Sequence, residues 1–276
     1  MNGARTALVI DTRPVWESDI AASRLQPAQH PSISYLLAPL QVFRGLPQDP
    51  VLRQWSDLKS SHPMRGGFIG LVATSPACVE ALQAMPSFSR EISKELGRAL
   101  RLFAVGEGSA NHLAAWARLY GEGLQVVSPD QGSGVAAFLK MLESQEGLTI
   151  QKATTLFVLL ESITNQPDLS LGLNAKGFRT ARFGLYERID RAFELPPSVL
   201  ESSVVSVIVS SSALVSQAVK GLLSQGLAPQ QAHWFCHHSK IVKALQKADL
   251  PFIHQVADFS PERLFKKVVE LFRAND

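Results

Sequence analysis

The sequence has few cysteines and no long apolar run. Only Cys78 and Cys236 occur in 276 residues, each inside an apolar segment, so a disulfide framework is not expected and a reducing compartment is. No apolar stretch approaches the roughly 18 to 20 residues that a membrane-spanning helix needs. The short apolar run near the N-terminus breaks at Asp11 without a small-residue cleavage site behind it. We therefore expect a cytoplasmic protein without a membrane partner.

Charged residues are also scarce. They make up 18% of the chain against 46% hydrophobic residues, which is enough apolar material for packed cores and argues against disorder. The net charge is +3, but Lys and Arg are spread along the chain and form no basic run. This distribution argues against a nucleic-acid partner and favours an acidic small molecule as the ligand.

The usual metal and nucleotide motifs are incomplete. HWFCHH holds His233, Cys236, His237 and His238, yet no CxxC or HExxH pattern supplies further zinc ligands. We favour His233 or His237 as a partner for a ligand carboxylate. The Gly-Glu-Gly turn at 106–108 lacks the rest of GxGxxG or GxxxxGK[ST], and QGSG at 131–134 is typical of a helix entry.

Short apolar runs alternate with helix-period segments along the chain, as in parallel α/β folds. A length of 276 residues fits two domains of roughly 100 to 150 residues. The expected strands are 6–11, 33–43, 67–73, 101–105, 124–128, 154–160, 178–189, 204–209, 232–236 and 252–256. The expected helices include 76–85, 108–120, 134–143, 168–176, 212–225, 239–248 and 261–272.

The chain also looks duplicated, because four segments of one half align with four of the other. Ser133 and Ser260 would be the N-caps of equivalent helices in this alignment. The aligned pairs are 71–82 with 207–219, 102–116 with 234–245, 126–142 with 254–271, and 6–25 with 155–177. The long segments 33–43 and 178–189 then look like connectors. Composition alone does not decide between two crossings there and a single domain boundary near residue 150.

Five ordered motifs make the sequence similar to the uroporphyrinogen-III synthase family from about residue 6 to 270. They are Thr12-Arg13-Pro14, Thr74-Ser75, Ala104-Val105-Gly106 with Ser109-Ala110, GLYER with Tyr186, and Ser210-Ser211. The resemblance implies an α/β fold of two flavodoxin-like, doubly wound parallel-sheet lobes, joined by a two-stranded β connector and with the active site in an inter-lobe cleft. It favours lobes of 1–35 plus 190–276 and of 41–184, with connectors 36–40 and 185–189.

The resemblance also implies a reaction. The family cyclises hydroxymethylbilane to uroporphyrinogen III, inverting the last pyrrole ring and losing water, in haem biosynthesis and without a metal or organic cofactor. The expected partner is this substrate, with neighbouring tetrapyrrole-pathway enzymes as a further option, and the expected state is a monomer. The alternative is a two-lobed, non-catalytic binding protein for an acidic small molecule.

The candidate site residues follow strand ends, where backbone N–H groups and helix N-termini can bind carboxylates. Tyr186 is the catalytic candidate, since a phenol can donate a proton to a leaving hydroxyl; a packing role is the alternative. The substrate-binding candidates are Thr12, Arg13, Thr74, Ser75, Gly106, Ser109, Ser162, Ser210, Ser211 and Ser239. Simple helix capping, or a surface salt bridge for Arg13, would be the ordinary explanation of each.

The sequence departs from the family pattern at three places. One is Tyr186, which is followed by Glu187-Arg188 instead of the common basic residue and Thr. Glu161 and Ser162 stand where the family usually has Arg-Gly, so an expected cation is missing. Cys236, His237 and His238 stand where it often has Ile-Gly-Pro. These differences affect individual contacts more than the resemblance itself.

Overall fold

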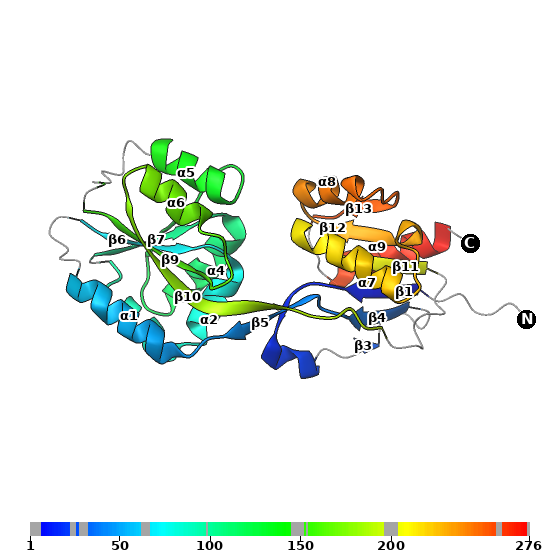
Figure 1. The fold of residues 1–276 in the computed structure, drawn as a ribbon, viewed down its shortest axis with the longest axis horizontal. Coiled ribbons are helices and arrows are strands. Elements are labelled where there is room, and N and C mark those ends of the chain that lie inside the picture. Colours follow the sequence, from blue (N-terminus) through cyan, green and yellow to red (C-terminus); the bar gives the residue numbers. More distant parts are fainter. Residues whose placement is uncertain are drawn as a thin grey trace, which may run out of the picture. The chain divides into compact units, whose positions relative to one another are not determined.

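The computed structural model describes residues 7–22, 26–27, 33–61, 67–97, 99–144, 152, 154–195, 204–257 and 261–274. It divides into two compact units, unit 1 (1–43 and 189–276) and unit 2 (44–188). The chain passes between them in two neighbouring strands, β5 (Gln41–Gly45) and β10 (Arg179–Asp190) (Figure 1). Gln41 donates to Asp190 at 2.8 Å, and Arg44 pairs with Glu187 at 3.1 Å.

Unit 1 contains a six-stranded sheet with helices on both faces. Its order is β13 (Ile253–Gln255), β12 (His233–Cys236), β11 (Val204–Ile208), β1 (Ala7–Asp11), β4 (Ile33–Leu37) and β3 (Gln26–Pro27). The strands are parallel except β3, which runs antiparallel to β4. Helices α7 (Val215–Ser224) and α8 (Ser239–Lys247) pack on one face, and α9 (Pro261–Ala274) packs through Leu264 and Val268 on the other.

The second sheet has seven strands. Its order is β2 (Val15–Trp16), β5, β10, β9 (Leu156–Ser162), β6 (Ile69–Ala73), β7 (Leu100–Ala104) and β8 (Val126–Val127). Helices α5 (Val135–Ser144) and α6 (Asp168–Ala175) cover one face. Helices α1 (Gln48–Ser61), α2 (Pro76–Gln83), α3 (Pro86–Ser93) and α4 (Glu107–Arg118) lie on the other, where Trp55 and Phe88 pack against Phe183.

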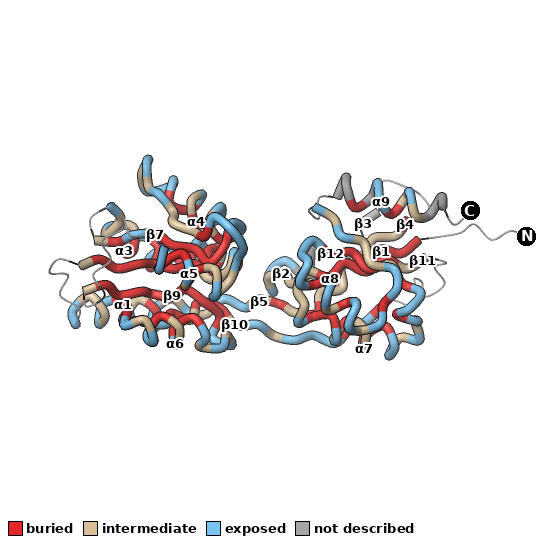
Figure 2. The backbone as a smooth tube through the Cα atoms, turned by 90° about the horizontal axis from the view of Figure 1, so that it is seen from above, coloured by how far each residue is buried: buried red, intermediate tan, exposed pale blue. Residues whose placement is uncertain are grey.

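Burial explains why the central strands read as unbroken apolar runs. Every residue of β1, β6 and β9 is buried, because helices cover both faces of each sheet (Figure 2). In unit 2 the ring of Phe157 makes edge-to-face contacts with those of Phe103, Phe138 and Phe178. No helix of the described residues has the length and apolarity to span a bilayer.

The two sheets share one strand order, which confirms the predicted duplication. The correspondence is in the order of the strands across each sheet. That order is β13, β12, β11, β1, β4 in unit 1 and β8, β7, β6, β9, β10 in unit 2. These are the pairs of segments that the sequence alignment matched. The predicted α/β fold with two doubly wound parallel sheets is confirmed.

Three sequence expectations about elements need correction or fall outside the structure. The segment 33–43 is not one strand but β4 and β5, because Pro39 lies between them and lacks the N–H that a ladder requires. Gly134, and not Ser133, directly precedes α5. Ser260 lies outside the described residues.

Candidate functional site

The polar turns of unit 2 gather at one edge of the sheet. Thr74 and Ser75 follow β6, Gly106 follows β7, and Ser162 ends β9. Parallel strands bring their carboxyl ends to the same edge, where open α/β sheets bind ligands. The structure therefore brings the predicted unit 2 residues together, including Ser109 in the first turn of α4.

Tyr186 reaches this edge because of a β-bulge in β10. Gly184 pairs with Glu161, but the next paired residue, Tyr186, lies opposite Ser162, so Leu185 is the extra residue. Side chains alternate between the faces of a sheet, and one inserted residue reverses the alternation. The bulge thus places Tyr186 on the face of Ser162, which is opposite to the face of Glu161.

The phenol of Tyr186 sits in a small polar cluster. Its oxygen lies 3.1 Å from Ser75 Oγ, and Arg188 Nη2 donates to it at 3.3 Å. The guanidinium carbon of Arg188 also lies 5.9 Å from the centre of the Tyr186 ring. Tyr186 is fully buried while Arg188 is exposed, so the guanidinium faces solvent beside a protected phenol.

Ser75 and Thr74 also have structural roles. Ser75 Oγ accepts the amide of Cys78 at 3.3 Å and so caps α2, whose first residue is Pro76. Thr74 Oγ1 donates to the carbonyl oxygen of Leu160 at 2.7 Å and joins the ends of β6 and β9. The capping alternative therefore holds for Ser75, but it leaves the contact of Ser75 with Tyr186 in place.

Gly106 is required by a close approach of two chain segments. It precedes α4 in an extended conformation (φ −179°, ψ 171°), which any residue can adopt. A Cβ atom there would lie 2.8 Å from the Cβ of Ser133. The glycine thus lets the 131–134 turn pack against the N-terminus of α4.

Gly106→Ala is expected to lower the free energy of unfolding by about 1–3 kcal/mol, because the new methyl group would overpack the contact with Ser133. Gly108→Ala is the matched control, since its Cβ would meet only Pro76 Cγ at 3.7 Å. Urea unfolding of both variants measures the effect. Equal stability of the Gly106 and Gly108 variants would show that the turn is not tightly packed.

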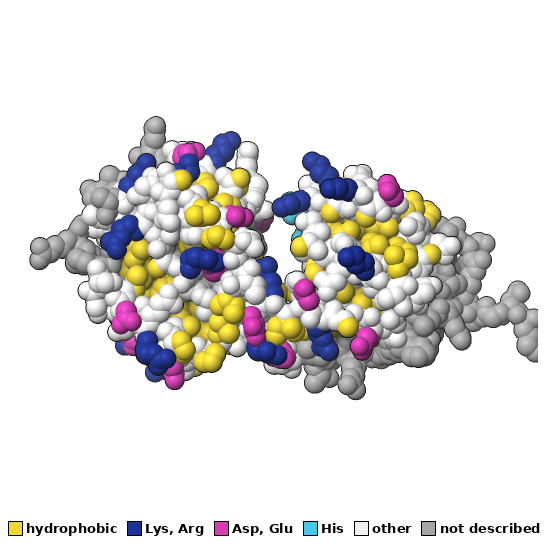
Figure 3. Space-filling view, viewed as in Figure 1, with side chains coloured by type: hydrophobic (Ala, Val, Ile, Leu, Met, Phe, Trp, Pro, Cys, Tyr) yellow, Lys and Arg dark blue, Asp and Glu magenta, His cyan; other side chains and the backbone are white. Residues whose placement is uncertain are grey.

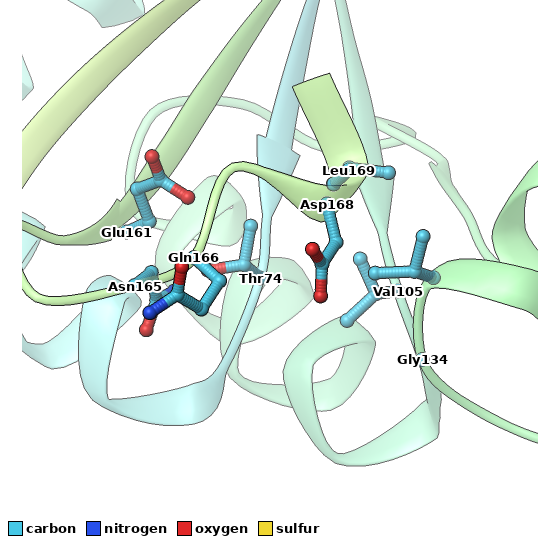
Figure 4. A pocket seen from close by; sticks show the side chains of 9 residues that line it. Thr74, Val105, Gly134, Glu161, Asn165, Gln166, Asp168 and Leu169 are labelled. Atoms are coloured by element: carbon cyan, nitrogen blue, oxygen red, sulfur yellow. The ribbon is translucent and has the colours of Figure 1, made fainter. Parts of the chain in front are cut away.

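A pocket of about 250 Å³ opens on the α5 and α6 face of the same edge (Figure 4). Its lining residues are Thr74, Val105, Gly134, Val135, Glu161, Asn165, Gln166, Asp168 and Leu169. The Glu161 side chain is 5% exposed and forms an ion pair with Arg182, which also donates to the Asn165 carbonyl at 2.8 Å. Burial raises the pKa of Glu161 above its ordinary value, although Arg182 and Asn165 oppose the shift.

Unit 1 carries a second polar cluster at the carboxyl end of β1. Arg13 Nε and Nη2 donate to the Asp11 carboxylate at 2.9 and 2.6 Å, and Tyr35 donates to the same carboxylate. Burial alone would lower the pKa of Arg13, but the bonds to Asp11 raise it above its ordinary value. Burial and Asp11 also raise the pKa of Tyr35. Arg13 is therefore charged, held in place by Asp11, and 36% exposed.

The remaining candidates of unit 1 lie at the same edge. Thr12 is buried and donates to the Ile208 carbonyl at 2.6 Å. Thr74 makes the same kind of bond in unit 2, to the Leu160 carbonyl. Ser211 Oγ accepts the Ala213 amide at 3.3 Å, Ser210 precedes it, and Ser239 is the exposed first residue of α8. These serines therefore lie at helix starts, where N–H groups lack partners within the helix.

The histidines separate into two places. His237 follows β12, and burial, His238 and Arg13 together lower its pKa. His233 begins β12, at the opposite end of the strand, and its Nδ1 lies 3.0 Å from His254 Nε2. Of the two alternatives, His233 or His237, His237 therefore lies at this edge and His233 does not. Within the described residues no three His, Cys, Asp or Glu side chains form a metal-ligating group.

The sequence alone does not predict the contacts of the charged residues in the two clusters. Arg188 follows Tyr186 by two residues and departs from the family pattern, but regular alternation does not predict the bulge that sets the face of Tyr186. Asp11 was visible two residues before Arg13, and its carboxylate also accepts the amide of Arg13 at 3.0 Å. Arg182 lies 21 residues from Glu161, and only the pairing of β9 with β10 brings them together.

Charge is dispersed over the surface. On the face shown in Figure 3, Lys and Arg side chains lie scattered among Asp and Glu side chains on both units. A basic stripe of the kind that binds a nucleic-acid backbone is not visible on that face.

Comparisons with known proteins identify the family. The family model described as Uroporphyrinogen-III synthase HemD matches residues 38–266. A mutant uroporphyrinogen III synthase from the extreme thermophile Thermus thermophilus has 16% identity and a TM-score of 0.56, over 96% of this chain and 99% of that chain. Uroporphyrinogen-III synthetase from Helicobacter pylori has 16% identity and a TM-score of 0.51, over 94% and 99%. No curated protein sequence matches significantly. Because the family model covers well over half of its residues, the chain belongs to the uroporphyrinogen-III synthase family.

Proposed function

We propose that this member of the family closes hydroxymethylbilane to uroporphyrinogen III at the polar strand ends around Tyr186. The assignment to these residues rests on one observation. The buried phenol of Tyr186 contacts Ser75 and lies beside the solvent-facing guanidinium of Arg188. Family membership supports the reaction itself. Nothing in the comparisons favours the non-catalytic binding protein.

Tyr186 assists the departure of the substrate hydroxyl. The phenol donates its proton to the leaving oxygen as the carbon–oxygen bond breaks, water departs, and a cationic azafulvene remains. Ser75 Oγ, 3.1 Å away, can donate a hydrogen bond to the phenolate oxygen until the ring proton released in the last step returns to it. Arg188 stabilises the transient negative charge on that oxygen, because its guanidinium already donates to it.

The later steps depend on shape more than on further proton donors. The substituted carbon of the last ring attacks the cation and forms a spiro intermediate. The older bond between that carbon and the preceding bridge then breaks, and the bridge bonds to the other α-carbon of the ring, which is thereby inverted. Loss of the ring proton then gives the macrocycle. Elimination and carbon–carbon bond formation are redox-neutral, so these steps proceed without a cofactor. The site must hold the chain bent so that the substituted carbon reacts.

Recognition relies on the carboxylates of the substrate. The N-terminus of α4, which no side chain caps, presents N–H groups at the edge of unit 2, and Arg188 adds a cation. In unit 1 the start of α8 and the fixed guanidinium of Arg13 offer the same chemistry. Each cluster therefore suits the carboxylates of a polyanionic substrate. The protein acts as a cytoplasmic monomer on a small molecule, without a nucleic-acid partner.

The isomer of the product tests this function. Purified protein is given freshly prepared hydroxymethylbilane, and the products are oxidised and separated as porphyrin isomers. Type III in excess over a protein-free control is the expected result. Only type I, the product of spontaneous closure, would favour the binding protein instead.

A further inference from the structure

The pocket beside Thr74 has a charge that does not suit the carboxylates of the substrate. Glu161 and Asp168 both line it, and in the view of Figure 4 they lie on either side of Thr74. Arg182 pairs with Glu161 but is not a lining residue. Two carboxylates against one partly exposed cation give the region a net negative charge, which repels acetate and propionate groups.

Part of the pocket suits an aromatic ring. Val105, Val135 and Leu169 provide apolar walls beside the uncharged polar residues Thr74, Asn165 and Gln166, and the volume of about 250 Å³ is large enough for one substituted pyrrole. A pyrrole offers an apolar ring with a single N–H donor. Carboxylates only accept hydrogen bonds when ionised, so Glu161 is the complementary partner for that donor.

We propose that this pocket binds the pyrrole core of the substrate, with Glu161 as a catalytic residue that accepts a ring N–H and stabilises the cationic azafulvene. The inference rests on the proposed function. It adds a negatively charged residue, Glu161, to the cations and N–H groups that bind the substrate carboxylates. Glu161 lies next to Ser162, which pairs with Tyr186 in the sheet. One open chain of four rings is long enough to contact both sides of this strand end.

Arg182 has a positioning role in this account. It fixes the Glu161 side chain and, through its bond to the Asn165 carbonyl, the loop that forms the pocket wall. A purely structural ion pair would have the same contacts. Kinetics therefore has to separate the two roles, because a structural pair affects stability without a selective effect on kcat.

Glu161→Gln tests the proposal, since it keeps the shape and removes the charge. We expect kcat for uroporphyrinogen III formation to fall about 10-fold with KM within about twofold, because the charge acts on the cation formed after binding. Asp168→Asn is a second variant at an exposed helix start and should lower kcat several-fold without a risk to folding. Glu143→Gln is the control, because it likewise removes the carboxylate of an ion pair in unit 2, with Lys176, but lies outside the pocket.

The outcomes separate the two proposals. Lower kcat in the pocket variants, with the Glu143 variant unchanged, supports the inference. Unchanged kcat in folded Glu161→Gln and Asp168→Asn, with wild type making type III, overturns the inference alone. If wild type makes only type I, the proposed function fails and the inference fails with it.

Discussion

Tyr186→Phe is expected to lower kcat about 100-fold while leaving the fold nearly unchanged, since general acid catalysis contributes about 10²- to 10⁴-fold. The buried ring keeps its packing, and only the hydroxyl between Ser75 and Arg188 is lost. KM should change little, because the phenol acts on the leaving oxygen. Initial rates of uroporphyrinogen III formation, with thermal unfolding of the same samples, give both quantities.

Tyr120→Phe is the matched control for this experiment. Tyr120 follows α4, is 41% exposed, and contacts Trp116 through its ring. The same chemical change there should leave kcat unaltered. If Tyr186→Phe retained full turnover, Tyr186 would have no part in hydroxyl departure and its burial would have to be explained by packing alone.

Asp11→Ala is expected to lower the free energy of unfolding by about 3 kcal/mol, as for other ion pairs that lose one buried partner. Asp11 is 1% exposed and accepts hydrogen bonds from Arg13 and Tyr35. Without it the Arg13 guanidinium stays partly buried beside His237. Since Arg13 is 36% exposed, water screens part of the cost and the value lies at the lower end of the usual range.

The double variant Asp11→Ala/Arg13→Met separates the destabilisation caused by an unpaired Arg13 from the destabilisation caused by lost packing. Removing both charges should destabilise the protein less than the sum of the two single variants, because no unpaired cation remains. Urea unfolding of all four proteins gives the coupling energy. Strict additivity would mean that the Asp11–Arg13 contact does not contribute to stability.

Most strands and helices could be predicted because their burial is simple. A strand covered on both faces, such as β9, must be apolar throughout, and a run of that kind ends visibly at its first polar residues, Glu161 and Ser162. Helix α1 can also be predicted, because Val51, Trp55 and Leu58 follow a helical period. The break between β4 and β5 was also readable, because Pro39 interrupts the run.

The candidate site was predictable as a set of strand ends but not as a set of contacts. Local rules place Thr74 and Ser75 at the edge, since a polar turn after a buried strand has few other places to lie. They do not predict the bulge at Leu185, which decides the face that Tyr186 occupies. They also do not predict that Glu161 finds Arg182 on the neighbouring strand, because strand register is set by the whole sheet.

Two threonines show how far the internal repeat carries. Thr12 follows β1 and Thr74 follows β6, which are not equivalent strands, yet each donates to a carbonyl near the end of the neighbouring central strand, at Ile208 and Leu160. The charged groups beside them differ, with Arg13 on Asp11 in unit 1 and Arg182 on Glu161 in unit 2. The duplication thus conserves the sheet edge, while the side chains at each edge differ in charge.

Hydrogen–deuterium exchange with and without uroporphyrinogen III, under anaerobic conditions, tests the central claim that the carboxyl ends of both sheets bind the tetrapyrrole. The account predicts slower exchange at 74–78, 106–110 and 162–166 in unit 2, and at 11–13, 210–214 and 237–241 in unit 1. Peptides at the amino ends of the strands should not change. Protection confined to those amino ends, or no protection at 74–78 and 106–110, would contradict it.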